Sequence, residues 1–204
     1  MSFWYEAFDR VTCVYKVNTL ADLKPSIYLG GTLTLPTGSS AYGDSSHNSF
    51  EITGRGMYRF DTNLIIEKTI YPYTLMLQGS YGKYLERSIN QEYGKPVEPY
   101  TKRLGDRKFL SISADYTFFL EDLDTLTITA ALSDLREDAG EIDQEQDPQT
   151  EMKKQSFSLT SSYASADLRY IYKATWSQAF QDDDRGMNFS VTNILTLGFS
   201  YAFN

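Results

Sequence analysis

The chain of 204 residues is poor in cysteine and histidine, and this scarcity excludes several kinds of site. The single Cys13 rules out an internal disulfide. The single His47 lies in a serine-rich loop, which argues against a metal centre with clustered ligands and against a nucleophile activated by an oriented base. We therefore expect no enzyme activity, no metal site and no cofactor.

The sequence also lacks long apolar runs and an excess of basic residues. No stretch reaches the roughly 18 apolar residues that a transmembrane helix needs. The net charge of −8 argues against a nucleic-acid partner, which requires a basic face. Residues 1–10 lack the basic start and the apolar stretch of a secretory signal. An exported form of this protein would therefore carry a signal that this chain does not include.

Large apolar residues alternate with small or polar ones along much of the chain, most clearly at the C-terminus. In the segment 189–203, Leu195, Leu197, Phe199 and Tyr201 fall on one side, with small residues between them. Side chains of a strand alternate between two faces, so this segment is a strand with one apolar face. Such a strand at the end of a chain leaves an exposed edge unless it closes a barrel.

Eight segments from residue 24 onward share this pattern, each about 10 residues long, which suffices to cross a bilayer as a tilted strand. We expect strands at 24–35, 49–61, 70–83, 107–120, 126–134, 155–165, 168–180 and 189–203. Short connections at 62–69, 121–125 and 166–167 alternate with longer polar ones at 36–48, 84–106, 135–154 and 181–188. This sorting is typical of outer-membrane barrels with short periplasmic turns. The predicted fold is therefore an all-β, antiparallel transmembrane β-barrel, a single domain over residues 1–204.

Residues 1–22 are predicted to be either an N-terminal strand or an extension. The alternation over 3–17 places Asp9 in the middle of its apolar face. A charge that faces lipid at mid-depth costs about 2–4 kcal/mol for basic groups and somewhat less for Asp. Either a bulge resets the register near Asp9 or this segment is not a full strand. If it does span, the count is nine, and an odd count implies a further strand and a barrel of 10–12 strands.

The alternation also sorts candidate functional residues onto two faces. Lipid-facing aromatic residues, which suit membrane–water interfaces, are expected at Tyr71, Tyr73, Tyr81, Tyr170, Tyr172, Trp176, Tyr201 and Phe203. Charged residues are expected to face the lumen at Glu51, Arg55, Arg59, Asp61, Asp115, Arg169 and Lys173. In a narrow barrel of about eight strands these charges would pair and fill the lumen. In a wider barrel they would line a wet pore and set its selectivity.

A short motif resembles a known family. The stretch Gly30-Gly31-Thr32-Leu33-Thr34-Leu35-Pro36-Thr37-Gly38, followed by Tyr42-Gly43 and an amphipathic strand from Phe50, resembles the outer-membrane barrel family associated with the meta-cleavage pathway of phenol degradation. The resemblance covers residues 25–80 and the C-terminal strand. It implies a channel or transporter for hydrophobic or aromatic compounds. A turn by itself accounts for Pro36 and Gly38 without any ligand, because Pro ends the ladder and Gly permits the turn.

The leading functional hypothesis is a passive channel or transporter in the bacterial outer membrane for small molecules, hydrophobic ones among them, with lipid as the other partner. One alternative is a non-conducting barrel whose acidic loops, 136–154 and 182–184, bind a partner or cations. Another is a soluble barrel of the lipocalin type, which keeps its apolar face inside. The oligomeric state is left open by the sequence.

Overall fold

The computed structural model describes residues 2–6, 10–17, 25–36, 40–42, 55–120, 123–180 and 193–202, with only the backbone described for the first two ranges. The described chain is all-β apart from short 3-10 turns, of which η3 spans Pro148–Thr150. Its strands are β1 (Ser2–Glu6), β2 (Arg10–Val17), β3 (Ser26–Thr34), β4 (Arg59–Ile70), β5 (Tyr73–Tyr84), β6 (Arg87–Glu92), β7 (Lys95–Arg103), β8 (Arg107–Phe119), β9 (Thr125–Glu137), β10 (Gly140–Ile142), β11 (Glu145–Asp147), β12 (Met152–Ala164), β13 (Tyr170–Ala179) and β14 (Asn193–Tyr201).

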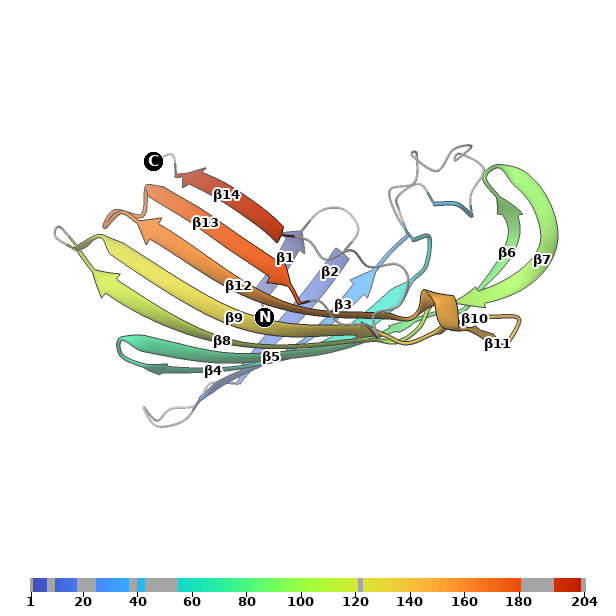
Figure 1. Cartoon of the computed structure of the whole chain (residues 1–204), viewed down its shortest axis with the longest axis horizontal. Helices are drawn as coiled ribbons and strands as arrows, with labels where there is room; N and C mark the ends of the chain where they lie inside the picture. Colours follow the sequence, from blue (N-terminus) through green and yellow to red (C-terminus); the bar gives the residue numbers. More distant parts are fainter. Residues whose placement is uncertain are drawn as a thin grey trace.

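The strands form two antiparallel sheets. The main sheet has 10 strands in the order β1-β2-β3-β4-β5-β8-β9-β12-β13-β14, and the second has four in the order β11-β10-β7-β6. Figure 1 shows the main sheet as a strongly curved wall, with β1 and β2 behind β12 and β13. The hairpin turns β4–β5, β8–β9 and β12–β13 lie together at its left end, near the C-terminus. The four-stranded sheet projects from the opposite end.

The predicted all-β antiparallel class is confirmed, and so is a set of eight antiparallel strands after residue 24. The predicted strands at 24–35, 107–120, 155–165 and 168–180 coincide closely with β3, β8, β12 and β13. Their clean period of two explains the agreement, because alternation is a local property of the sequence.

The predicted strand at 49–61 and connection at 62–69 are displaced from what the structure contains. Residues 62–69 lie within β4, and residues 55–58 are not strand, while 49–54 lie outside the described residues. The run Leu64-Ile65-Ile66 hid the alternation, because Ile65 is an apolar residue on the otherwise polar face. The turn to β5 falls at Tyr71-Pro72, since Pro lacks the N–H that a ladder position needs.

The N-terminal segment 3–17 is a hairpin and not one strand. β1 pairs with β2 from Ser2 opposite Val14 to Glu6 opposite Arg10. Asp9 falls between the two strands, among residues outside the described ranges. The count of nine assumed a single strand here; with two strands in its place, the main sheet has 10 strands among the described residues.

The predicted loops at 84–106 and 135–154 contain regular structure. β6 and β7 form a hairpin inside the first, and β10 and β11 form one inside the second. β10 pairs with β7 through Glu141 opposite Arg103, which joins the two hairpins into one extension. Their Pro, Gly and charged residues masked the alternation, and the pairing between hairpins is set by tertiary structure.

A small core lies where this extension meets the main sheet. Met57, Tyr84 and Ile89 are buried there, with Tyr42 and Tyr100 packed against them. Arg87 donates hydrogen bonds to the carbonyl oxygens of Gly56 and Tyr42, which ties the β3–β4 connection to β6.

Gly105, between β7 and β8, is expected to be intolerant of a side chain. A Cβ at this position would overlap the carbonyl oxygen of Asp138 and lie 3.0 Å from that of Ala139. Overpacking of this kind costs about 1–3 kcal/mol, so Gly105→Ala should lower the free energy of unfolding in urea by this amount. Gly79→Ala is the control, because its Cβ would meet nothing closer than an oxygen at 3.9 Å. Equal losses in both variants would contradict the packing at Gly105.

Candidate functional site: the polar face and its charged cluster

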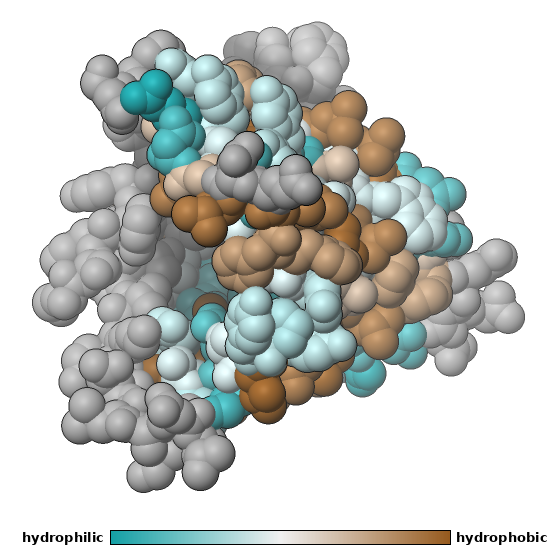
Figure 2. All heavy atoms as spheres, turned by 90° about the vertical axis from the view of Figure 1, so that its left-hand side faces the viewer, coloured by the Kyte–Doolittle hydropathy of each residue, from teal (hydrophilic) through white to brown (hydrophobic). Residues whose placement is uncertain are grey.

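Strand register divides the main sheet into two chemically different faces. On β5, Tyr73, Leu75, Leu77 and Tyr81 share one face and are exposed, and the same face continues across the sheet. For example, Leu77 lies opposite Ile112 on β8, and Ile112 lies opposite Leu132 on β9. Figure 2, which views the short-turn end, shows broad hydrophobic areas on the surface there. Large apolar side chains on this face are thus turned away from the rest of the described chain.

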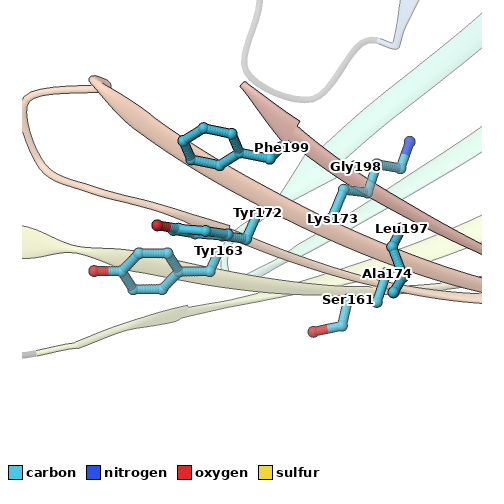
Figure 3. A pocket seen from close by; sticks show the side chains of 8 residues that line it. All are labelled: Ser161, Tyr163, Tyr172, Lys173, Ala174, Leu197, Gly198 and Phe199. Atoms are coloured by element: carbon cyan, nitrogen blue, oxygen red, sulfur yellow. The ribbon is translucent and has the colours of Figure 1, made fainter. Parts of the chain in front are cut away.

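Aromatic rings cluster on the apolar face near the short turns. Tyr73 packs on Tyr116 with ring centres 4.9 Å apart, and Tyr172 packs on Phe199 at 5.0 Å. Figure 3 shows Tyr163, Tyr172 and Phe199 side by side on β12, β13 and β14, next to a hollow lined by small residues such as Ala174. The rings form a band across neighbouring strands.

The predicted lipid-facing aromatics fall at two levels. Tyr71, Tyr73, Tyr170, Tyr172 and Tyr201 lie toward the short turns, and Tyr81 and Trp176 lie toward the long connections; Phe203 is outside the described residues. Tyr116, Phe118, Tyr163 and Phe199 also belong to this band of rings. The alternation placed them on the apolar face, but they were not among the expected interfacial aromatics.

The height of the apolar band can be judged along β5. Eight residues separate Tyr73 from Tyr81, or about 27 Å at a rise of about 3.4 Å per residue. In a barrel whose strands tilt by about 40°, this length would span about 21 Å along the axis, close to the apolar band of about 25 Å in outer-membrane barrels. The band is bounded at the far end by Lys108 and Arg136, which lie opposite each other on β8 and β9.

The opposite face is polar and made of small side chains. One register row contains Thr69, Thr74, Asp115, Thr129, Thr160, Thr175 and Thr196. Its hydroxyls bond across strands, with Thr69 to Thr74 at 3.2 Å and Thr160 to Thr175 at 3.0 Å. The Oδ1 atom of Asp115 is buried and has no hydrogen-bond partner in the described structure. This row is a belt of hydroxyl groups with one carboxylate.

A cluster of charged residues crosses the polar face near the long connections. Arg59 donates from Nε to Asp61 Oδ2 at 2.9 Å and from Nη1 to the Tyr84 hydroxyl at 2.9 Å. Arg55 bonds the same hydroxyl at 3.2 Å and pairs with Glu137, which is 5% exposed. Two guanidinium groups, two carboxylates and one phenol thus form a single network, which we call the arginine–tyrosine cluster.

The environment of Arg55 favours its charged form. Burial lowers the pKa of Arg55, but the neighbouring Tyr84 and Glu137 more than compensate and raise the pKa above its ordinary value. Gly82 makes room for the cluster, because a Cβ there would overlap Asp61 Oδ1 and lie 3.3 Å from Arg59 Cδ. The cluster therefore carries paired charge at one end of the polar face.

The structure brings some of the predicted lumen residues together and separates others. Arg55, Arg59 and Asp61 belong to the cluster, and Glu51 lies outside the described residues. Asp115 lies in the hydroxyl belt, and Lys173 lies two residues beyond the belt toward the short turns, opposite Ser162. Arg169 lies in the turn before β13, with Nε 3.2 Å from Asp167.

The sequence interpretation missed two members of the cluster. Tyr84 continues the polar face of β5 two residues after Gly82, so the alternation could have identified it. Glu137 was assigned to a loop, because the strand that carries it was expected to end at residue 134. It lies opposite Arg107 at the end of β9.

Neither known proteins nor a metal centre identifies this chain. No protein-family model and no curated protein matches the chain. Among the residues that the structure describes, no group of three or more His, Cys, Asp or Glu side chains could hold a metal ion. No helix in this part of the chain is long and apolar enough to cross a membrane. His47 lies outside the described ranges.

Proposed function

We propose that this chain is an outer-membrane β-barrel that acts as a passive channel for small hydrophilic molecules. The supporting observation is an exposed apolar face opposite a polar face of small side chains on one curved antiparallel sheet. Met57, Tyr84, Ile89 and Ala179 are the only buried hydrophobic residues in the described part, whereas Leu75, Leu195 and Leu197 are 49–74% exposed. Such a distribution suits lipid outside and water inside, since lipid then covers the apolar face.

The strand order is compatible with closure of the sheet by β1 and β14. These are the end strands of a ten-stranded antiparallel sheet, so they run in opposite directions and are able to pair. Closure would give the backbone N–H and C=O groups of both edge strands hydrogen-bond partners, which lipid does not supply. It also gives the even strand number usual for bacterial barrels, with short turns at one end and long connections at the other.

The small side chains of the polar face favour an open lumen. Eight strands give an interior that side chains just fill, and a ten-stranded barrel is wider. The hydroxyl belt around Thr160 and Thr175 and serines such as Ser113 and Ser158 leave space in such an interior. A hydroxyl-lined pore favours hydrophilic solutes over the hydrophobic compounds that the family resemblance implies.

A non-conducting barrel is the second candidate, and one observation favours it. The arginine–tyrosine cluster is internally paired, and its members reach from β4 to β9 across the polar face. Paired charges of this kind stabilise a filled interior. The soluble lipocalin-type alternative would need the apolar face inside, and the exposure of Leu75, Leu195 and Leu197 argues against it.

Single-channel conductance of the refolded protein in a planar bilayer tests the proposal. Steady conductance that rises with salt concentration would support a water-filled pore. Insertion without conductance would overturn the channel and leave the filled barrel. Failure to insert into lipid, with a monodisperse protein in buffer without detergent, would overturn the membrane assignment.

Reversing one charge of the cluster is expected to change ion selectivity. Arg55→Glu places a second carboxylate beside Glu137, so the potassium-to-chloride permeability ratio should rise several-fold. Arg136→Glu is the control, because Arg136 has the same charge but lies on the apolar face, with its side chain 56% exposed. Reversal potentials in a salt gradient measure the ratio. An unchanged ratio for Arg55→Glu would remove the cluster from the ion path.

A further inference from the structure

A hollow on the polar face lies beside the arginine–tyrosine cluster and has a different chemical lining. It has a volume of about 200 Å³ and is lined by Tyr28, Leu29, Gly30 and Thr32 of β3, Asn63 and Ile65 of β4, and Gln78 of β5. Register places all of these except Leu29 on one face, since Gly30 is opposite Asn63 and Ile65 is opposite Gln78. Asp61 of the cluster lies opposite Thr32, so the hollow is directly next to the charged network, on its short-turn side.

The described part of the lining contains no charged side chain. It offers two carboxamides, a hydroxyl, a phenol and an aliphatic group, and the absent side chain of Gly30 opens space between Tyr28 and Thr32. These residues give an ionic solute no counter-charge, and Arg59 and Asp61, further along the same face of β4, are already paired at 2.9 Å. Burial of an unpaired charge is costly, so the hollow favours a neutral ligand.

The carboxamides retain hydrogen-bonding capacity. Asn63 donates from Nδ2 to Thr32 Oγ1 at 3.1 Å, which uses one of its two donor hydrogens. Gln78 makes no side-chain hydrogen bond to the described residues. A carboxamide both donates and accepts, and so does a ligand hydroxyl. Tyr28 and Ile65 supply the apolar surface that packs on the C–H side of a ring.

We infer that this hollow is a binding subsite for a neutral, six-membered ring that carries several hydroxyl groups, the chemistry of a sugar. Its volume is below the range of about 300–1,000 Å³ for sites of drug-sized ligands, which limits it to a single ring. The inference rests on the proposed channel, because the polar face must be filled with water for a solute to reach the hollow. The subsite would hold a passing sugar just beyond the charged cluster.

Equilibrium binding of methyl α-glucopyranoside to the refolded full chain in detergent micelles, followed by calorimetry or ligand-observed NMR, tests the subsite without requiring conduction. A dissociation constant in the millimolar range is expected. Gln78→Leu and Asn63→Ala should each weaken binding about tenfold, the loss for one or two hydrogen bonds. Gln155→Leu is the matched control, because Gln155 is on the opposite face, across from Asp134, and should bind as the unchanged protein does.

Three results would overturn the subsite: no measurable binding, equal binding by all variants, or tighter binding of glucuronate than of the neutral sugar. Circular dichroism of each variant shows whether it has folded. If one of the two variants, Gln78→Leu or Asn63→Ala, does not fold, the other still tests the subsite. Sugar binding without ion conductance would overturn the channel and leave the subsite in an interior that contains water but does not pass ions. Conductance without sugar binding would overturn the subsite alone.

Discussion

Ala130→Arg is expected to lower the free energy of unfolding in lipid vesicles by about 2–4 kcal/mol, the cost of a basic side chain at the middle of a lipid-facing strand. Ala130 is exposed on the apolar face of β9, where it lies between Ala114 and Leu159 on the neighbouring strands. Its position about halfway along the strand leaves a long basic side chain without easy access to either interface. Urea titration of the vesicle-inserted protein measures the change.

The adjacent residue provides the matched control. Ala131 points to the opposite face, between Ser113 and Ser158. Ala131→Arg should be tolerated within about 0.5 kcal/mol, because a wet lumen solvates the added charge. A large loss for Ala131→Arg as well would support the filled barrel. A large loss for Ala131→Arg alone would mean that the polar face is the one in lipid, and the proposal would be wrong.

Asp61→Asn is expected to destabilise the protein by about 3–5 kcal/mol, the usual cost of removing one partner of a buried ion pair. The side chains of Arg59 and Asp61 are each 10% exposed, and their contact is 2.9 Å. The neutral amide leaves the Arg59 guanidinium with the Tyr84 hydroxyl as its remaining partner in the cluster. Unfolding in urea, followed by tryptophan fluorescence, gives the change.

Asp134→Asn serves as the control, because Asp134 is also two residues from an arginine on its strand, Arg136. Asp134 pairs with Arg136 at 2.8 Å, with side chains 27% and 56% exposed. Exposed pairs are worth about 0–1 kcal/mol, so Asp134→Asn should have little effect. Comparable losses in the two variants would show that burial does not distinguish the cluster from a surface ion pair.

The open channel and the filled barrel assign different roles to the arginine–tyrosine cluster. In an open lumen the cluster narrows one end of a wet path, and its charge acts on passing ions. In a filled barrel it is a structural brace, and Asp61→Asn would change stability without any electrical consequence. The stability of Asp61→Asn and the selectivity of Arg55→Glu, measured together, separate these two roles.

The sequence by itself determined the two faces of the sheet and most of its strands. Alternation is a local property, so Leu75 and Leu77 could be assigned to one face and Thr160 and Ser162 to the other without knowledge of their neighbours. The eight antiparallel strands after residue 24 follow from this alternation and from the turns. The alternation misplaced strands where apolar and polar residues did not alternate cleanly, as at Leu64-Ile65-Ile66 in β4 and at Asp9, which falls between β1 and β2.

Only the tertiary structure decided which residues of a face meet. Arg55 and Glu137 are 82 positions apart, and their pairing depends on the register of every strand between β4 and β9. The hollow beside Gln78 likewise requires three strands in one alignment, and the extension requires β10 to pair with β7. Register is set by the whole sheet, because a shift of one residue turns every side chain of a strand to the other face. The charged residues could thus be predicted one at a time, and their assembly into a network could not.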